Sequence, residues 1–172
     1  FAVSVLNHMR EKLIGYQIEY GNLYGLEATP AESATFRFAR LDRERFPGIR
    51  TAGREGDKPY YTNSTKLPAD YDGTLQDALI NQDSLQPLYT TGTVFHVYME
   101  QELEDWKKAR NLLRGMITEH HIPCFTLSPV YTICQTCGYL PGRQEICPKC
   151  KGTADVYSRI AGYYRPVHDW ND

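Results

Sequence analysis

The sequence predicts a chain of the α/β class, followed by a metal site formed by four cysteines. Between residues 1 and 130, apolar residues with helical spacing alternate with short runs of β-branched and aromatic residues. This alternation is typical of βαβ units around a parallel sheet. Two Cys-x-x-Cys pairs then follow, Cys134 with Cys137 and Cys147 with Cys150.

The N-terminal segment predicts a long helix. Apolar residues recur with helical spacing from Val3, and the pattern runs to about Tyr20. Further along the chain, glycines and prolines mark a loop over residues 48–59, and a short extended stretch follows at 60–65.

A second helix is predicted to begin at Thr29. Thr29 can act as an N-cap, Pro30 then occupies the first helical position, and Glu32 completes a capping box. The helix should end before Pro47. Unpaired N–H groups of residues 31–33, together with the helix dipole, make a possible anion site. An ordinary helix cap explains the same residues.

Four further elements precede the cysteines. Thr74 resembles the N-cap of a third helix, and residues 93–99 form a strand pattern. Residues 103–118 form the clearest amphipathic helix, and residues 123–127 form another strand pattern. Among the side chains nearby, Cys124 is predicted to be a buried, inert thiol.

The two cysteine pairs favour a closed four-sulfur metal site, which is structural because it leaves no position for substrate. Each pair is accompanied by glycine or proline, which tight turns need. Two disulfides are the alternative, but the chain shows no signal peptide and contains an unpaired fifth cysteine, Cys124. Four thiolates also suit an iron–sulfur cluster, although the short symmetrical spacing favours a zinc ribbon.

The composition indicates no nucleic-acid or membrane partner. The formal net charge is -2, and Lys and Arg form no basic tract that would bind a phosphate backbone. No apolar run approaches the roughly 18 residues that a membrane span needs. Together with the cysteine usage, these features favour a cytoplasmic protein.

The segment Arg159-Ile160-Ala161-Gly162-Tyr163, shortly after the second cysteine pair, resembles the glycyl-radical segment of anaerobic (class III) ribonucleotide reductases. In that family an Arg-x-x-Gly-Tyr motif follows a four-cysteine zinc site. Residues 61–65, 89–96 and 122–129 also resemble segments of the family's catalytic barrel, so the resemblance spans most of the chain.

The resemblance implies a ten-stranded α/β barrel of the glycyl-radical enzyme type. Residues 1–130 would be the C-terminal portion of this barrel, residues 131–154 a zinc ribbon, and residues 155–172 a radical loop at the barrel's centre. The chain opens at Phe1 without an initiator methionine. We therefore expect a C-terminal part of a larger enzyme, inactive without the remainder of the catalytic polypeptide.

The implied activity is the oxygen-sensitive reduction of ribonucleotides, as triphosphates, to deoxyribonucleotides. Gly162 would store a radical installed by a separate activating enzyme that uses S-adenosylmethionine and an iron–sulfur cluster. Zn²⁺ would be structural, and the enzyme would be an allosteric homodimer.

The thiyl cysteine that attacks the ribose in this family matches no residue of the chain. The reductant, formate or a redoxin, stays open.

Physical reasoning supports a glycine for radical storage. A radical on the α-carbon must flatten to delocalise over the amide and the carbonyl, and glycine has no Cβ to clash when this happens. The alternative is that Gly162 only supplies a turn with positive φ.

The segment at Thr29 also resembles the one that ribonucleotide reductases place under the substrate phosphates. The resemblance implies phosphate contacts at Thr29, Ala31, Ser33 and Ala34. Glu32 would either complete the helix cap or face the ribose as an acid or base.

Two other functional classes stay open. One is a zinc-ribbon binding module without catalysis, in which the segment 159–163 contacts a partner. The other is a different glycyl-radical enzyme, such as a relative of formate lyases, although such relatives generally lack the four-cysteine site.

Overall fold

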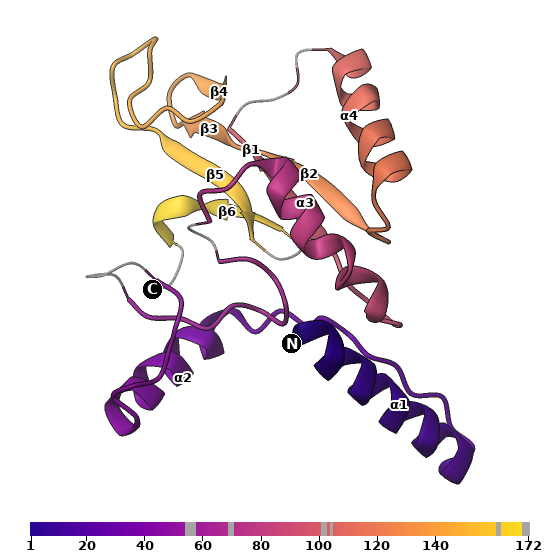
Figure 1. Cartoon of the computed structure of the whole chain (residues 1–172). Coiled ribbons are helices and arrows are strands. Elements are labelled where there is room, and N and C mark those ends of the chain that lie inside the picture. Colours follow the sequence, from indigo (N-terminus) through magenta and orange to yellow (C-terminus); the bar gives the residue numbers. More distant parts are fainter. Residues whose placement is uncertain (54–57, 69–70, 101–102, 104, 161–162, 170–172) are drawn as a thin grey trace. The chain divides into compact units, whose positions relative to one another are not determined.

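A computed structural model describes the chain except for residues 54–57, 69–70, 101–102, 104, 161–162 and 170–172 (Figure 1). For Glu32, Ser33, Ile160 and Asp169 it describes the backbone only. The chain forms two compact units. The first comprises residues 1–95 and 116–124, and the second comprises residues 96–115 and 125–172.

Helices α1 (Ala2–Tyr20), α2 (Glu32–Arg45) and α3 (Leu75–Asp83) and the short 3-10 helix η1 (Gln86–Leu88) lie in the first unit. Helix α1 has the predicted bounds and stops at Gly21, whose φ of 68° is left-handed. One core cluster of this unit lies beside α1 and η1 and consists of Leu6, Leu26, Ala28, Leu85 and Tyr89. No helix in the described part of the chain is long and apolar enough to cross a membrane.

The predicted start of α2 is wrong. The N-cap is Ala31 rather than Thr29, and no side chain of the cap residue bonds the first turn. Instead, the side chain of Asn63 takes the N–H of Ala31, so the first turn is capped from another part of the chain. The predicted end is confirmed, because α2 stops at Arg45.

Helix α3 begins where its capping signal predicts. The Thr74 hydroxyl accepts a hydrogen bond from the N–H of Asp77 at 3.1 Å, and the Asp77 carboxylate accepts one from the N–H of Thr74 at 3.1 Å. This reciprocal capping box satisfies two N–H groups that the helix itself leaves unpaired.

The described part of the chain contains a βαβ unit, as the alternation of patterns predicts. It consists of β1 (Phe95–Met99), α4 (Trp106–Glu119) and β2 (Phe125–Pro129). Phe95 N donates to Cys124 O, and Val130 N donates to Met99 O, both at 2.9 Å. The bonded residues advance in the same direction along both strands, so the pair is parallel.

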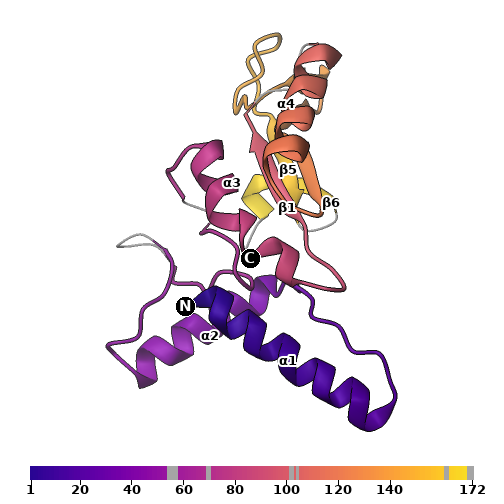
Figure 2. The same cartoon turned by 45° about the vertical axis from the view of Figure 1, so that its right-hand side comes forward.

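The second unit contains a four-stranded antiparallel sheet that the sequence patterns did not predict. Its strand order is β4-β3-β5-β6, and β5 and β6 lie side by side in Figure 2. Segments 131–154 and 155–172 therefore contribute strands to one sheet. The strands are β3 (Tyr131–Cys134), β4 (Gly138–Pro141), β5 (Asp155–Ile160) and β6 (Tyr163–Pro166), followed by the short 3-10 helix η2 (Val167–Asp169).

Candidate metal centre

The first cysteine pair lies in the turn between two paired strands. Cys134 is the last residue of β3 and pairs with Gly138, the first residue of β4. Gly138 has a φ of 76°, a left-handed conformation that glycine adopts without a Cβ clash. The N–H of Cys137 points at the Cys134 sulfur, 3.4 Å away, so this turn aims a backbone donor at a thiolate.

The second pair forms a similar turn, with a difference from expectation. Cys147 N donates to Gly152 O at 2.8 Å, and Lys151 N donates to Cys147 O at 2.9 Å. The residue after the last cysteine is again left-handed, but it is Lys151, with a φ of 62°. Gly152 comes one residue later, so the left-handed residue of this turn is not a glycine.

The four sulfur atoms converge. All lie within 4.8 Å of one another, and the Cys134 and Cys150 sulfurs are 3.5 Å apart. Tetrahedral zinc with Zn–S bonds of about 2.3 Å needs sulfurs about 3.8 Å apart, so the cluster is compatible with zinc. Cys134 and Cys147 are buried, and Leu140 packs with them. All five cysteines of the chain are free thiols in this structure, in contrast to the disulfide alternative.

The cluster is electrostatically uneven. Backbone N–H groups of Cys150 and Lys149, despite opposing burial, lower the pKa of Cys147 to about 6. Burial, followed by contacts with Cys150 and Cys147, raises the pKa of Cys137 to about 12. Four thiols without a cation therefore resist full ionisation. A divalent cation supplies the missing positive charge, because a coordinating thiol is deprotonated outright.

The candidate radical glycine lies between two paired strands in the sequence. Ile160, the last residue of β5, pairs with Tyr163, the first residue of β6. Gly162 itself lies outside the described residues. Strand β5 also pairs with β3, the strand that ends at Cys134. One sheet therefore carries both the first cysteine turn, here called a metal knuckle, and the two strands on either side of Gly162 in the sequence.

The candidate phosphate site at the start of α2 is only partly as expected. The N–H of Ala31 is not unpaired, because it donates to the Asn63 Oδ1 at 3.0 Å. The first intrahelical bond runs from Thr35 N to Ala31 O at 3.0 Å. The N–H groups of residues 32–34 therefore have no acceptor within the helix. Thr29 is exposed just before this turn.

Sequence reasoning missed the contacts that hold the segment 61–65 against α2. The Tyr61 hydroxyl donates to the Asp42 carboxylate at 2.9 Å, and Tyr61 N donates to Thr35 O at 3.4 Å. The resemblance had singled out this segment, but the sequence carries no local signal that Asn63 caps a helix elsewhere in the chain.

A buried amide network holds the same segment from its other end. Gln82 and Gln86 are 1% and 0% exposed. Gln82 Nε2 donates to Thr65 O at 2.9 Å, and Gln86 Nε2 donates to Gln82 Oε1 at 2.6 Å. The Thr93 hydroxyl donates to Gln86 Oε1 and completes the network. Satisfied buried networks of this kind fix one arrangement of the backbone.

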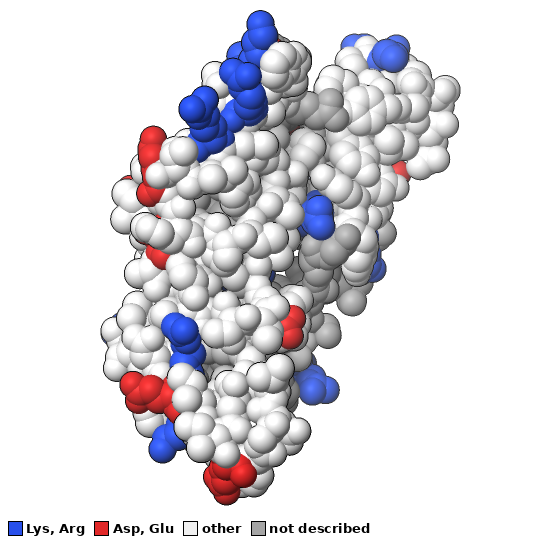
Figure 3. All heavy atoms as spheres, turned by 90° about the vertical axis from the view of Figure 1, so that its right-hand side faces the viewer, with Lys and Arg blue, Asp and Glu red and all other residues white. Residues whose placement is uncertain are grey.

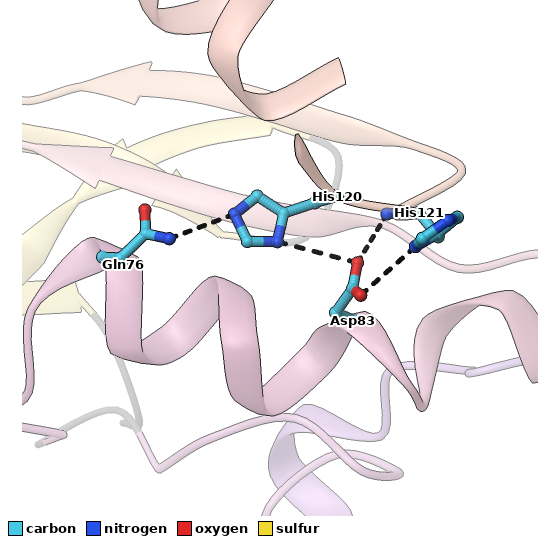
Figure 4. A network of polar contacts seen from close by, with 4 residues as sticks. All are labelled: Gln76, Asp83, His120 and His121. Atoms are coloured by element: carbon cyan, nitrogen blue, oxygen red, sulfur yellow. Dashed lines mark hydrogen bonds and ion pairs between the residues drawn. The ribbon is translucent and has the colours of Figure 1, made fainter. Parts of the chain in front are cut away.

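The paired histidines after α4 contact the end of α3. Asp83 accepts a hydrogen bond from His121 N, and its carboxylate lies 3.6 Å from His120 Nδ1 and 3.3 Å from His121 Nδ1 (Figure 4). These bonds lower the pKa of Asp83, the His121 N–H most of all. The nearby Cys124 is exposed, so the predicted burial of this thiol is wrong.

Charged side chains cluster on α4. Figure 3 shows one group of Lys and Arg side chains at the upper left, with Asp and Glu side chains in separate smaller groups. The exposed basic residues of α4 are Lys107, Lys108, Arg110 and Arg114. Lys107 and Arg110 lie over the Trp106 ring, 5.9 and 5.4 Å from its centroid. Such contacts partly anchor the basic groups.

Comparison with known proteins gives a consistent result. The family model of anaerobic ribonucleoside-triphosphate reductases matches residues 1–172. The chain is 27% identical to the Haemophilus influenzae anaerobic ribonucleoside-triphosphate reductase over 173 residues, covering 94% of this chain and 23% of the relative. It is 27% identical to the bacteriophage T4 protein of the same name over 140 residues, covering 78% of this chain and 22% of the relative.

Solved structures show the same fold. An anaerobic ribonucleotide reductase superposes with a TM-score of 0.76 and 22% identity, covering 97% of this chain and 25% of that one. The Thermotoga maritima enzyme in complex with dATP and CTP superposes with a TM-score of 0.73 and 23% identity, covering 97% and 26%. The chain spans about a quarter of the length of these relatives.

Proposed function

This chain belongs to the anaerobic ribonucleoside-triphosphate reductase family, and we propose that it carries the zinc site and the radical glycine of such an enzyme. The observation that carries the proposal is the family match over residues 1–172, which includes a four-sulfur cluster on the sheet that flanks Gly162. The activity proposed for the complete enzyme is the reduction of ribonucleoside triphosphates to deoxyribonucleotides.

Zn²⁺ is the proposed metal of the four-cysteine cluster. The converging sulfurs and the two buried cysteines support a closed tetrahedral site. With four protein thiolates the ion has no position for substrate, so its role is structural. Bound metal would hold the β3–β4 turn against the segment 147–152, and thereby support the sheet that leads to Gly162.

Gly162 is the proposed radical residue. A separate activating enzyme, with S-adenosylmethionine and an iron–sulfur cluster, would break one Cα–H bond of Gly162 homolytically and carry the hydrogen atom away. The remaining electron delocalises over the flanking amide and carbonyl, which requires a residue without Cβ. The competing role for Gly162 is a turn with positive φ, for which glycine is also suited.

The start of α2 is the proposed site for the substrate triphosphate. The N–H groups of residues 32–34 have no intrahelical acceptor, and the helix dipole favours an anion there. In this proposal Thr29, Ser33 and Ala34 contact phosphate. Ala31 would lie next to the phosphate without donating its N–H, because that N–H is already bonded to Asn63. Glu32 faces the ribose as an acid or base, since a carboxylate beside the phosphates would repel them.

The remainder of the polypeptide would complete a ten-stranded barrel, to which the unit β1-α4-β2 contributes, and would supply the thiyl cysteine. The zinc ribbon and radical loop are proposed for residues 131–154 and 155–172. We place the reaction in the cytoplasm and expect a homodimer. The dATP and CTP named for the Thermotoga maritima structure accord with nucleotide binding in the family.

Anaerobic turnover of the full-length polypeptide tests this function. The protein, its activating enzyme and S-adenosylmethionine are incubated with a ribonucleoside triphosphate, in parallel with formate and with a reduced redoxin as the reductant. We expect deoxyribonucleotide in one of these reactions. A Gly162→Ala variant should form none while retaining its zinc. Wild-type activity in that variant would contradict the proposal and favour a purely structural glycine.

A further inference from the structure

Four tyrosines form a cluster on the antiparallel sheet, one from each strand. The cluster, hereafter the tyrosine cluster, consists of Tyr139 on β4, Tyr131 on β3, Tyr157 on β5 and Tyr164 on β6. The Tyr131 ring stacks on the Tyr157 ring, with centroids 5.5 Å apart and planes 2° apart. Its centroid lies 5.3 Å from that of Tyr164 and 5.8 Å from that of Tyr139.

Tyr131 is the centre of this cluster, because it contacts the other three rings. It is the direct cross-strand partner of Tyr157. Tyr164 pairs with Arg159, two residues beyond Tyr157 on the same strand, so its ring projects from the same face. Through these two rings Tyr131 contacts both β5 and β6, the strands on either side of Gly162.

The cysteine cluster lies on the face of the sheet opposite to the tyrosine cluster. Residues alternate between faces along a strand, so Tyr131 projects from one face and Thr132 and Cys134 from the other. That other face is closely packed. Its residues Thr132, Cys134, Leu140, Val156 and Ser158 are all buried. The tyrosine cluster is only half-buried apart from the exposed Tyr139. The cluster therefore contacts β5 and β6 without being part of the sulfur cluster.

We propose that Tyr131 is a positioning residue for the radical glycine: it fixes β5 and β6, the strands that flank Gly162, through its ring contacts rather than through the metal. This inference rests on the function proposed for Gly162. Hydrogen-atom transfer needs reacting atoms roughly 3–3.5 Å apart, and an error of about 1 Å can lower a rate about 10²-fold. Small displacements of β5 and β6 would thus reduce radical formation while zinc stays bound.

Radical yield and zinc content, measured on the same samples, test the proposal. The full-length polypeptide is activated anaerobically, and electron paramagnetic resonance gives the number of radicals per chain. We expect Tyr131→Ala and Tyr131→Leu to form about tenfold less radical than wild type, or lower still, with unchanged zinc. Tyr131→Phe keeps the ring and should restore the wild-type yield and spectrum.

Tyr139→Ala is the matched control. Tyr139 lies on the same face and contacts Tyr131, but it belongs to β4, which does not pair with β5 or β6. Its loss should leave the radical yield near that of wild type.

Three results would overturn the inference. The first is a wild-type radical yield in Tyr131→Ala and Tyr131→Leu. The second is zinc loss in both variants, which would make Tyr131 part of the metal-binding fold. The third is an equal loss of radical in Tyr139→Ala. Absence of a radical in the wild-type protein would instead contradict the function proposed for Gly162, so the two failures are distinguishable.

Discussion

Asn63 caps helix α2 from a distant part of the sequence: its Oδ1 accepts the Ala31 N–H at 3.0 Å, although 32 residues separate the two. The bond takes up the Ala31 N–H, so an anion at the start of α2 would have to bind the N–H groups of residues 32–34 instead. It also means that substitutions at Asn63 report on the start of α2 without altering α2 itself.

Asn63→Ala should destabilise the protein by about 1 kcal/mol, the usual effect of losing a helix cap. Urea unfolding measures this change. Ser64→Ala, at the adjacent residue, is the control and should not weaken the cap. An unchanged unfolding free energy for Asn63→Ala would show that the Asn63 bond contributes nothing in solution.

Asn63→Asp should separate capping from phosphate binding. The carboxylate still accepts the Ala31 N–H, and near a helix N-terminus it adds about 0.3–1 kcal/mol of stability. The added negative charge repels phosphate, so nucleotide affinity in the full-length enzyme should fall several-fold. Calorimetric titration with a ribonucleoside triphosphate measures this effect. Undiminished affinity would argue against a phosphate site at the start of α2.

The two metal knuckles offer a matched pair of backbone substitutions. Lys151, with a φ of 62°, should be relieved of strain by Lys151→Gly, which we expect to stabilise the metal-bound protein by about 1 kcal/mol. Gly138→Ala should destabilise it by a similar amount, because Gly138 has a φ of 76°. The space around its Cβ position is open, so the added methyl group meets no clash and the backbone strain is the whole effect. Thermal unfolding with zinc present measures both. Shifts of the same sign would contradict this account.

Asp83 should make stability depend on pH. Its folded pKa is lowered, chiefly by the His121 N–H. The ionised carboxylate therefore stabilises the fold at every pH above the unfolded pKa of about 3.9, and this contribution is lost as pH falls through the lower folded pKa. At pH 7, Asp83→Asn should be less stable by about 1 kcal/mol, and in acid the difference should disappear. A difference that is constant with pH would refute this role.

Removal of zinc should loosen the antiparallel sheet. A strong chelator added to the zinc-loaded protein should increase amide hydrogen exchange in β3, β4 and β5, because metal binding supplies folding free energy to small sites of this kind. The N–H groups of α1 provide an internal reference and should keep their protection. Unchanged exchange in all three strands would show that the sheet does not depend on the metal.

The sequence predicted those parts of the structure that have local signals. The capping box of Thr74 and Asp77 lies within one helical turn, and the cysteine spacing brings the donors of each knuckle together. The N-terminus of α2 was misplaced because its cap, Asn63, comes from tertiary structure. A capping pattern at Thr29 cannot reveal a competing acceptor so far along the chain.

The antiparallel sheet had no comparable local signal. Its strands are four to six residues long, and their pairing depends on cross-strand contacts such as Tyr131 with Tyr157. The buried Gln82 and Gln86 were missed because amide side chains usually indicate a surface, and only the folded structure shows their partners. The four cysteines were found because metal ligation requires particular residues at short spacings.

Electron paramagnetic resonance of the activated full-length protein, prepared anaerobically, tests the central claim most directly. We predict a doublet from the one hydrogen left on the Gly162 α-carbon, which collapses when glycine deuterated at the α-position is incorporated and is absent from Gly162→Ala. A signal that is unaffected by deuterated glycine, or that survives in Gly162→Ala, would contradict the assignment of the radical to this residue.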